Sequence, residues 1–427
     1  MWWMWRNSGL VFMCAGYRLR RYALRVGLSP FGRYGLLLPR YVLDMRSVRG
    51  EQQQLKDQEE EMELKKWPDD FHTGLFELAK GGNLNVQELK ERWNELMEFK
   101  RKHLPKSLLR FRSIENDNEL KFRQSEIDGE LCFRDIRTLN DPFDSLLQSV
   151  KDDPSLNKVV KSVNMELRNS GYIVCFNEYR EDIEETKNMV ETSQMWDHYA
   201  KGYRGCCMVY DPSSWGAEWQ DALFPVYYRK EHQDFINDFK RSKDDDREWS
   251  FNSYFFNKYI MTHKLTCWSH EREWRIILDK NLIKRLYDKG CDIRLLTKKF
   301  KRPISLNEDL KDYSCEKIMV DRFKYFLDTD GPIIQNNYSY DCSVKGMPLR
   351  DDTPEFESIL IDFKKTFKDN CFEKTFKIIF GNGIVSNDRN ELIKYCQKYP
   401  DIALFDMIIN DYNEFIPQQV KVKDNGE

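Results

Sequence analysis

The sequence lacks the short motifs that identify many enzymes. It contains no G-x-x-x-x-G-K-[ST] phosphate loop, no dinucleotide-binding G-x-G-x-x-G, no G-x-S-x-G nucleophile turn and no H-E-x-x-H metal pair. Its six histidines are scattered without the spacing of metal ligands, so we predict no metal site. The eleven cysteines form no C-x-x-C pair, which argues against a zinc ribbon or a disulfide framework and is typical of a reducing compartment.

The sequence also lacks a strong excess of charge and a long apolar run. A net charge of -3 gives no reason to expect nucleic acid or an anionic membrane as a partner. The apolar stretch over residues 9–16 is far too short to span a bilayer, so we predict no transmembrane segment. With 41% hydrophobic and 33% charged residues, the composition is that of a soluble globular protein, and we expect a cytoplasmic location.

The first fifty residues differ from the rest of the chain in composition. They contain nine Arg, no Lys and the single acid Asp44, so they carry a charge of +8. An Arg-rich, acid-poor and amphipathic segment is typical of a mitochondrial presequence. The alternative is a disordered extension or leader with no folded role. The location is then mitochondrial under the first interpretation and cytoplasmic under the second.

Hydrophobic periodicity predicts an α+β fold. Residues 86–103 place apolar side chains at spacings of three and four, which predicts an amphipathic helix that ends before Pro105. Further helical segments are predicted over residues 188–199, 249–265 and 389–398. Short apolar runs predict strands at "LLRFRS", "ELCFRDI", "YIVCFNE", "GCCMVYD", "FPVYYRK", "REWRIIL" and "FKIIFGN". Strands and helices without strict alternation favour a mixed or antiparallel sheet with packed helices.

These patterns divide the chain into five segments. Residues 1–62 form the basic leader and a polar linker, and residues 63–105 form a helical segment. Residues 106–279 form the main α+β domain. Residues 280–370 are rich in Lys, Asp and Asn and are predicted to hold an insertion. Residues 371–427 supply a strand and a helix that complete the domain.

The densest group of charged and aromatic residues is "TCWSHEREWRIIL" at residues 266–278. On a strand, residues two apart share a face, so Glu271, Glu273 and Arg275 are expected on one side. Two carboxylates on one face repel each other unless a cation or a ligand lies nearby, and such crowding shifts their pKa values. Arg275 neutralises them in the structural interpretation. In the functional one, Glu271 and Glu273 are presented to a substrate.

Three other stretches combine polar and aromatic residues. In "QMWDHYAKGYRGCCMVYD", Trp196, His198 and Tyr199 close a helix and either pack a core or line a pocket with one titratable imidazole. In "RFRS", Arg112 is either a surface charge or a fork for a phosphate or carboxylate.

The third stretch is "LNDPFDS" at residues 139–145. Asp141 is suited to cap a helix that begins at Pro142. In the alternative interpretation this loop borders a pocket, with Asn140 or Asp144 as a polar side chain within it.

Taken in chain order, these strings resemble the family called domain of unknown function 2971. The resemblance covers about residues 107–423, and its specific part consists of the Trp-x-His-Tyr and Glu-x-Glu-Trp-Arg strings. Asn177 stands where the family usually has Ser, and the long segment after the Glu-x-Glu strand is unusual. The resemblance implies a role in stress or antiviral defence.

A looser similarity links the chain to the R-S-E type of ADP-ribosyltransferases. It implies that Arg112 holds NAD, that Glu273 is the catalytic carboxylate and that Glu271 orients the acceptor. Asn177 then occupies the position of the middle Ser, and Trp196 or Tyr199 stacks on the nicotinamide.

These resemblances lead to one leading function and two alternatives. The leading hypothesis is an NAD-using ADP-ribosyltransferase-like enzyme or glycohydrolase, with His198 beside the two glutamates and an unknown small-molecule or protein acceptor. The first alternative is a non-catalytic ligand- or protein-binding module in which the Glu-x-Glu-x-Arg face is a structural ladder. The second is a metal-dependent hydrolase or nuclease that uses His198, His270 and Glu271, although no ligand spacing favours it.

Overall fold

The structure is a computed structural model, and all residues that it describes lie within the unit Glu63–Glu427. They are residues 66–80, 84–114, 116–136, 171–179, 192–229, 249–296, 302–311, 314–328, 337–340, 358–362, 377–409 and 415–420, with isolated residues between 139 and 164. The predicted leader, whether presequence or disordered extension, lies outside the described residues, as do Asn140 and Pro142.

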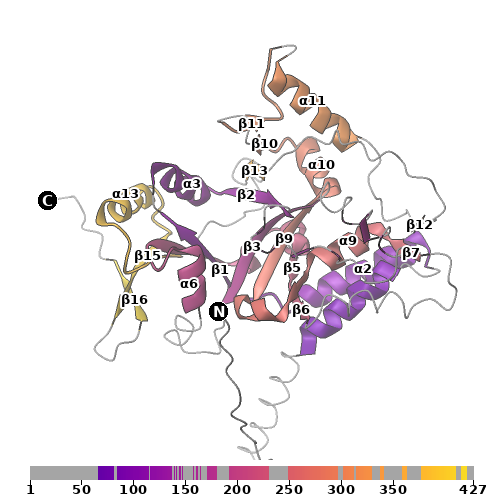
Figure 1. The fold of residues 1–427 in the computed structure, drawn as a ribbon, viewed down its shortest axis with the longest axis horizontal. Helices are drawn as coiled ribbons and strands as arrows, with labels where there is room; N and C mark the ends of the chain where they lie inside the picture. The colour runs from indigo at the N-terminus through magenta and orange to yellow at the C-terminus, as the bar shows by residue number, and fades with distance from the viewer. Residues whose placement is uncertain are drawn as a thin grey trace, which may run out of the picture. The chain divides into compact units, whose positions relative to one another are not determined.

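Most described strands belong to one large sheet (Figure 1). Ten of them lie in the order β11-β10-β13-β2-β3-β1-β4-β14-β15-β16, while β9 pairs with β3 and with β5. Their bounds are β1 Ser107–Ser113, β2 Glu130–Asp135, β3 Gly171–Tyr179, β4 Gly205–Tyr210, β5 Leu223–Pro225, β9 Glu273–Asp279, β10 Ile293–Leu296, β11 Ile304–Ser305, β13 Ser358–Asp362, β14 Lys377–Phe380, β15 Ala403–Ile409 and β16 Phe415–Gln419. Within this sheet the pair β14–β15 is parallel and the other pairs are antiparallel, which confirms an α+β fold with a mixed sheet.

Helices and two small sheets complete the described fold. The helices include one over residues 66–80, α2 Val86–Arg101, α3 Asp117–Ile127, α6 Ser193–Tyr199, α7 Ala217–Ala222, α9 Ser253–Met261, α10 Lys280–Asp288, α11 Cys315–Asp328 and α13 Ser386–Cys396, with the 3-10 turns η2 Pro212–Ser214 and η3 Thr266–Glu271. The small sheets pair β6 Tyr227–Arg229 with β8 His263–Leu265, and β7 Trp249–Asn252 with β12 Asn337–Tyr340. The helix predicted over residues 249–265 is wrong at both ends, where β7 and β8 lie.

The predicted amphipathic helix is confirmed as α2. Asn85 caps it, because its side chain accepts hydrogen bonds from the backbone N–H groups of Gln87 and Glu88 while the Glu88 carboxylate accepts one from the Asn85 N–H. Leu89 and Met97 are buried on its inner face. The described strands β10, β11 and β13, which come from the predicted insertion 280–370, extend the main sheet rather than forming a separate one.

Strand β3 is the point at which the large sheet forks. One edge of β3 pairs with β9 over residues 171–177, from Gly171 opposite Asp279 to Asn177 opposite Glu273. The other edge pairs first with β2, at Tyr172 and Ile173, and then with β1, at residues 177–179. Between these two short pairings β1 and β2 diverge, so the sheet opens into two wings. One wing is β1-β4-β14-β15-β16, and the other is β2-β13-β10-β11.

The two faces of the β1 wing pack against different partners. Leu109 and Phe111 of β1 form a small apolar cluster with Met195 and Trp196 of α6. The alternate residues of β1 point to the opposite face, where Leu108 joins the main core. Arg110 and Arg112 share this second face with Leu108, on the side of α3. The sheet therefore separates a face covered by α6 from a face covered by α3.

Candidate functional site

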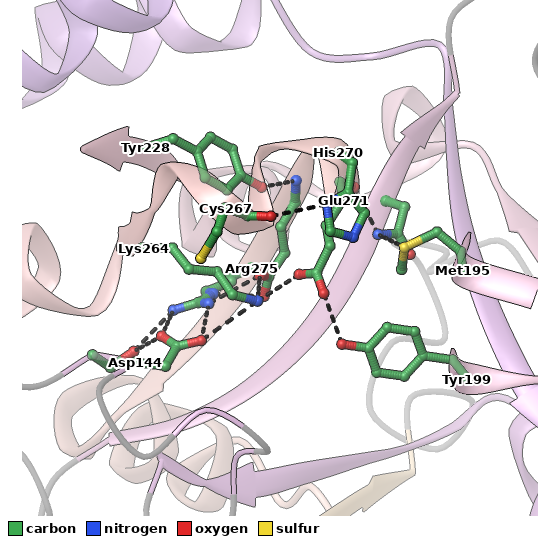
Figure 2. Close-up of polar contacts among 12 residues, drawn as sticks. Asp144, Met195, Tyr199, Tyr228, Lys264, Cys267, His270, Glu271 and Arg275 are labelled. Atoms are coloured by element: carbon green, nitrogen blue, oxygen red, sulfur yellow. Dashed lines mark hydrogen bonds and ion pairs between the residues drawn. The ribbon is translucent and has the colours of Figure 1, made fainter. Parts of the chain in front are cut away.

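Arg275 is the centre of a buried polar network on the α6 face of the sheet (Figure 2). Its guanidinium is fully buried and donates to both carboxylate oxygens of Asp144 at 2.7 Å and to the two oxygens of Glu273 at 2.6 and 2.9 Å. It also donates to Ser145 Oγ and to the Met261 carbonyl, each at 2.8 Å. Paired hydrogen bonds from one guanidinium to two carboxylates are strong and geometrically specific, so Arg275 holds Asp144 and Glu273 in a fixed arrangement.

Lys264 of β8 is the second cation of this network. Its Nζ donates to Glu271 and, at 3.0 Å, to Glu273, and it lies 3.6 Å from Asp144. We call Asp144, Lys264, Glu271, Glu273 and Arg275 the acid–base network. It contains three carboxylates and two cations, and each of the five residues is at least 90% buried. One carboxylate is therefore in excess.

The excess carboxylate explains why the two glutamates have opposite pKa shifts. Burial and the neighbouring Glu273 carboxylate raise the pKa of Glu271, and its bonds with Lys264 and Tyr199 only partly offset that rise. Burial acts in the same direction on Glu273, but the charges of Arg275 and Lys264 outweigh it and lower the pKa of Glu273. Glu273 is thus the firmly ionised member of the pair, and Glu271 is the member that takes up a proton more readily.

Glu271 reaches the network by a route that strand alternation did not predict. Strand β9 begins only at Glu273, and Glu271 is the last residue of η3. Arg272 between them has a φ of 43°, in the left-handed region that non-glycine residues rarely adopt. The expectation that Glu271 and Glu273 lie on one strand face is therefore wrong. The two carboxylates still meet because Lys264 lies between them.

Three polar side chains connect the network to its surroundings. The Tyr199 hydroxyl donates to Glu271 Oε1 at 2.8 Å from α6. Asn177 Nδ2 donates to the Glu271 carbonyl at 2.7 Å, and the Tyr228 hydroxyl accepts from the Glu273 N–H at 2.8 Å. Burial and the Glu271 charge raise the pKa of Tyr199, so its hydroxyl stays a donor. These bonds fix the backbone and the carboxylates on either side of Arg272.

The structure brings together only some of the residues that the sequence nominated. Glu271, Glu273, Tyr199 and Asn177 lie in or beside the network. Trp196 is fully buried and stacks on Tyr203, with ring centroids 5.4 Å apart.

His198 lies on the same helix as Tyr199 but is exposed. Its ring meets the Tyr199 ring edge-on at a centroid distance of 6.3 Å. His270, named with the metal-dependent alternative, lies in η3 with its Nδ1 3.2 Å from the Cys267 carbonyl.

Arg112 lies on the opposite face of the sheet from Glu273. Leu109 pairs with Asn177, which in turn pairs with Glu273, so these three residues share a face. Arg112 is three residues beyond Leu109 and points the other way. The structure therefore does not bring Arg112 to the two glutamates.

Arg112 instead lines a hollow of about 430 Å³ in the fork of the sheet. We call it the arginine hollow. Arg110, Arg112 and Arg123 all contact Glu126 of α3, Arg110 and Arg123 as close ion pairs and Arg112 with Nε 3.4 Å from Glu126 Oε2. The Tyr210 hydroxyl donates to Glu126 as well, at 3.1 Å. The remaining lining comes from Phe122, Ser125, Glu130, Cys132, Arg134, Leu296, Ser358 and Leu360.

Sequence reasoning missed Lys264 and the arginine hollow. Two crowded glutamates predict a nearby cation or ligand, and the string itself offers Arg275 as the cation. Nothing in the string marks Lys264 as a second one. Asp144, which one of the two interpretations of "LNDPFDS" places beside a pocket, is a buried partner of Arg275. The hollow had one signal, the Arg-x-Arg pair at residues 110 and 112.

Three further observations concern the described residues only. No helix among them is both long and apolar enough to cross a membrane. Nor do three or more His, Cys, Asp or Glu side chains of this part of the chain gather in an arrangement that could hold a metal ion. The eight cysteines that the structure describes are free thiols.

Comparison with known protein families identifies a match over part of the chain. Residues 195–276 match the family model described as "Protein of unknown function (DUF2971)". The matched segment contains Tyr199 and every member of the acid–base network except Asp144, whereas all residues that line the arginine hollow lie outside it. No curated protein and no solved structure matches the chain. The resemblance expected from the sequence is thus confirmed over residues 195–276, which match this family model.

Proposed function

We propose that this chain is a non-catalytic binding module for a small anionic ligand, with the acid–base network as its scaffold and the arginine hollow as its binding site. The observation that carries the proposal is the engagement of Glu273. Its side chain is 3% exposed, and both of its oxygens are held by Arg275 and Lys264. A carboxylate committed to two buried cations supports a structural role.

The charge of the arginine hollow supports an anion as its ligand. Four arginines and two glutamates line it, which leaves a charge of +2. Glu130 is further engaged by Arg294, so it offsets less of the arginine charge than the count implies. Guanidinium groups suit planar, multidentate recognition of carboxylate or phosphate oxygens. The volume of about 430 Å³ lies in the range of small-molecule sites.

A thermal-shift comparison of the full chain tests this proposal. Phosphate, sulfate, benzoate and NAD are compared with a chloride reference at equal ionic strength. Because sulfate and phosphate stabilise many proteins without binding, each shift is compared with that of Arg112→Gln and of the control Arg92→Gln. Arg92 is an exposed residue of α2 and lies outside the arginine hollow. We expect at least one anion to raise the Tm of the wild type and of Arg92→Gln more than that of Arg112→Gln. Equal shifts in all three proteins would refute the proposal.

The NAD-using transferase or glycohydrolase, with its defence role, stays a prediction, and it requires a different site geometry. It needs Arg112 and Glu273 to contact one ligand, and the register of β1, β3 and β9 puts them on opposite faces. Release of nicotinamide from NAD by the purified chain, lost in Glu273→Gln at unchanged stability, would favour that enzyme over the binding module.

A further inference from the structure

Three guanidinium groups in the arginine hollow have N–H groups that no described residue accepts. Arg112 donates only through Nε, over 3.4 Å to Glu126. Arg134 is exposed and makes no ion pair with any residue in the described part of the chain. Arg110 is 5% exposed, and its Nε lacks a hydrogen-bond partner among the described residues. A buried N–H group without an acceptor is unfavourable, which applies here to Arg110 Nε and points to a ligand that supplies the acceptor. The N–H groups of Arg112 and Arg134 are open to the same ligand.

The fork of the sheet is what brings these groups together. Arg134 shares a face of β2 with Cys132, and Arg110 shares a face of β1 with Arg112. Relative to β3 these are opposite faces, because Arg134 pairs with Ile173 whereas Arg110 lies over the Phe176 ring. The side chains converge because the two wings diverge and turn these faces toward each other. The site is thus built from two separate wings.

The number of free donors and the net charge favour a phosphate ester over a carboxylate. A carboxylate brings one negative charge and two oxygens, which a single guanidinium satisfies. A phosphomonoester brings a charge of about -1.5 to -2 at pH 7 and three acceptor oxygens. The hollow offers a charge of +2 and free N–H groups on Arg110, Arg112 and Arg134. The dianion therefore matches the hollow in charge and in number of acceptors.

The apolar part of the lining indicates that the phosphate is attached to an organic group. Phe122 of α3 is 42% exposed and lines the hollow. Leu296 and Leu360 line the hollow as well. An inorganic ion alone would leave this surface and most of the volume unfilled. A flat organic group could lie against the Phe122 ring.

We propose that the arginine hollow binds a small organic phosphomonoester, with the phosphate held by Arg110, Arg112 and Arg134 and the organic group against Phe122. This inference rests on the proposed function, because it names the chemical class of the anion that the module binds.

Calorimetric titration of the full chain with matched probes tests the ligand class. Phenyl phosphate and benzoate share a ring and differ in the anionic group. At pH 7.5 we expect phenyl phosphate to bind at least about tenfold more tightly, because it places more charge and more acceptors among the arginines. Its affinity falls toward that of benzoate at pH 5, because the second pKa of a phosphomonoester is about 6.

Two variants connect binding to the hollow. Arg112→Gln and Arg134→Gln are each expected to weaken phenyl phosphate at least about tenfold, while Arg92→Gln, with the same change of charge, leaves it unchanged. Arg134 is exposed, so Arg134→Gln keeps the test valid even if Arg112→Gln disturbs the fold.

The outcomes separate this inference from the function on which it rests. If benzoate binds as tightly as phenyl phosphate and both depend on Arg112, the phosphate class is overturned and the anion-binding module stands. If phenyl phosphate binds equally well to both variants and the wild type, the hollow is not the site and both proposals fail. If neither probe nor inorganic phosphate binds, the proposed function itself is overturned.

Discussion

Replacing Glu273 with Gln tests whether the acid–base network is a scaffold. The substitution keeps volume and shape but removes the charge that faces Arg275 and Lys264, and it places an amide N–H₂ against donors that now contact oxygens at 2.6, 2.9 and 3.0 Å. Removing one partner from a buried ion pair typically costs about 3–5 kcal/mol. Arg275 keeps both bonds to Asp144. We therefore expect a loss of about 3 kcal/mol in the free energy of unfolding.

Glu271→Gln is the matched control within the same network. The network holds one more carboxylate than cations, and Glu271, whose pKa is raised, is the carboxylate that takes up a proton more readily. A neutral side chain therefore replaces Glu271 with less disturbance than it replaces Glu273. Gln also keeps an oxygen that can accept from Tyr199. We expect a loss of at most about 1 kcal/mol, near the net value of an ordinary hydrogen bond.

Urea unfolding at pH 7, followed in parallel by tryptophan fluorescence and far-ultraviolet circular dichroism, measures both variants. Coincident transitions are required before free energies are compared. Wild-type stability in Glu273→Gln, within about 0.5 kcal/mol, would refute the scaffold role, since surface substitutions give changes of that size. A loss in Glu271→Gln as large as that in Glu273→Gln would refute the assignment of the excess charge to Glu271.

Three further predictions concern the stability contributions of Glu271, Trp196 and Gly205. Because the pKa of Glu271 is raised, its contribution to stability is present below its ordinary value of 4.5 and is lost as pH rises through the raised pKa; Glu271→Gln should remove that loss in a pH series of unfolding free energies. Trp196→Ala should lower the free energy of unfolding by about 3–5 kcal/mol in the same urea assay, because a fully buried ring leaves a cavity. Gly205→Ala should cost about 3 kcal/mol or more, since an added Cβ would lie 1.9 Å from the Arg112 carbonyl oxygen; an unchanged urea midpoint would contradict the close packing of β4 on β1.

The sequence was most informative where local pattern alone determines structure. Short apolar runs predicted β1, β2, β3, β4, β9 and β14 within a residue or two, because a half-buried or buried strand needs that composition. The amphipathic period predicted α2, and its Asn85 cap fits the first residue. The single helix predicted over residues 249–265 was wrong at both ends, because the apolar residues there suit a helix and a strand equally well. Pairing with distant strands makes the two ends β7 and β8.

The site was predictable only in part, because its geometry depends on pairings between distant segments. The crowding of Glu271 and Glu273 correctly indicated a need for cations. No local pattern could show that Arg272 turns the chain, that Lys264 lies between the carboxylates, or that Asp144 reaches Arg275. Arg112 stays a predicted anion-binding side chain. Its position relative to Glu273 follows from the register of three strands, which the sequence does not contain.

The bond between Arg275 and Asp144 has a consequence for the folding kinetics of this protein. The two residues are 131 positions apart, so the link closes one of the longer loops in the chain. Closing a long loop is entropically unfavourable until surrounding contacts have formed, and the guanidinium loses its water shell only when the core encloses it. We therefore expect this link to form after the rate-limiting barrier to folding. Interactions that form so late slow unfolding and leave the rate of folding almost unchanged. The network would then act mainly on the rate of unfolding, and so on how long the folded state persists once it has formed.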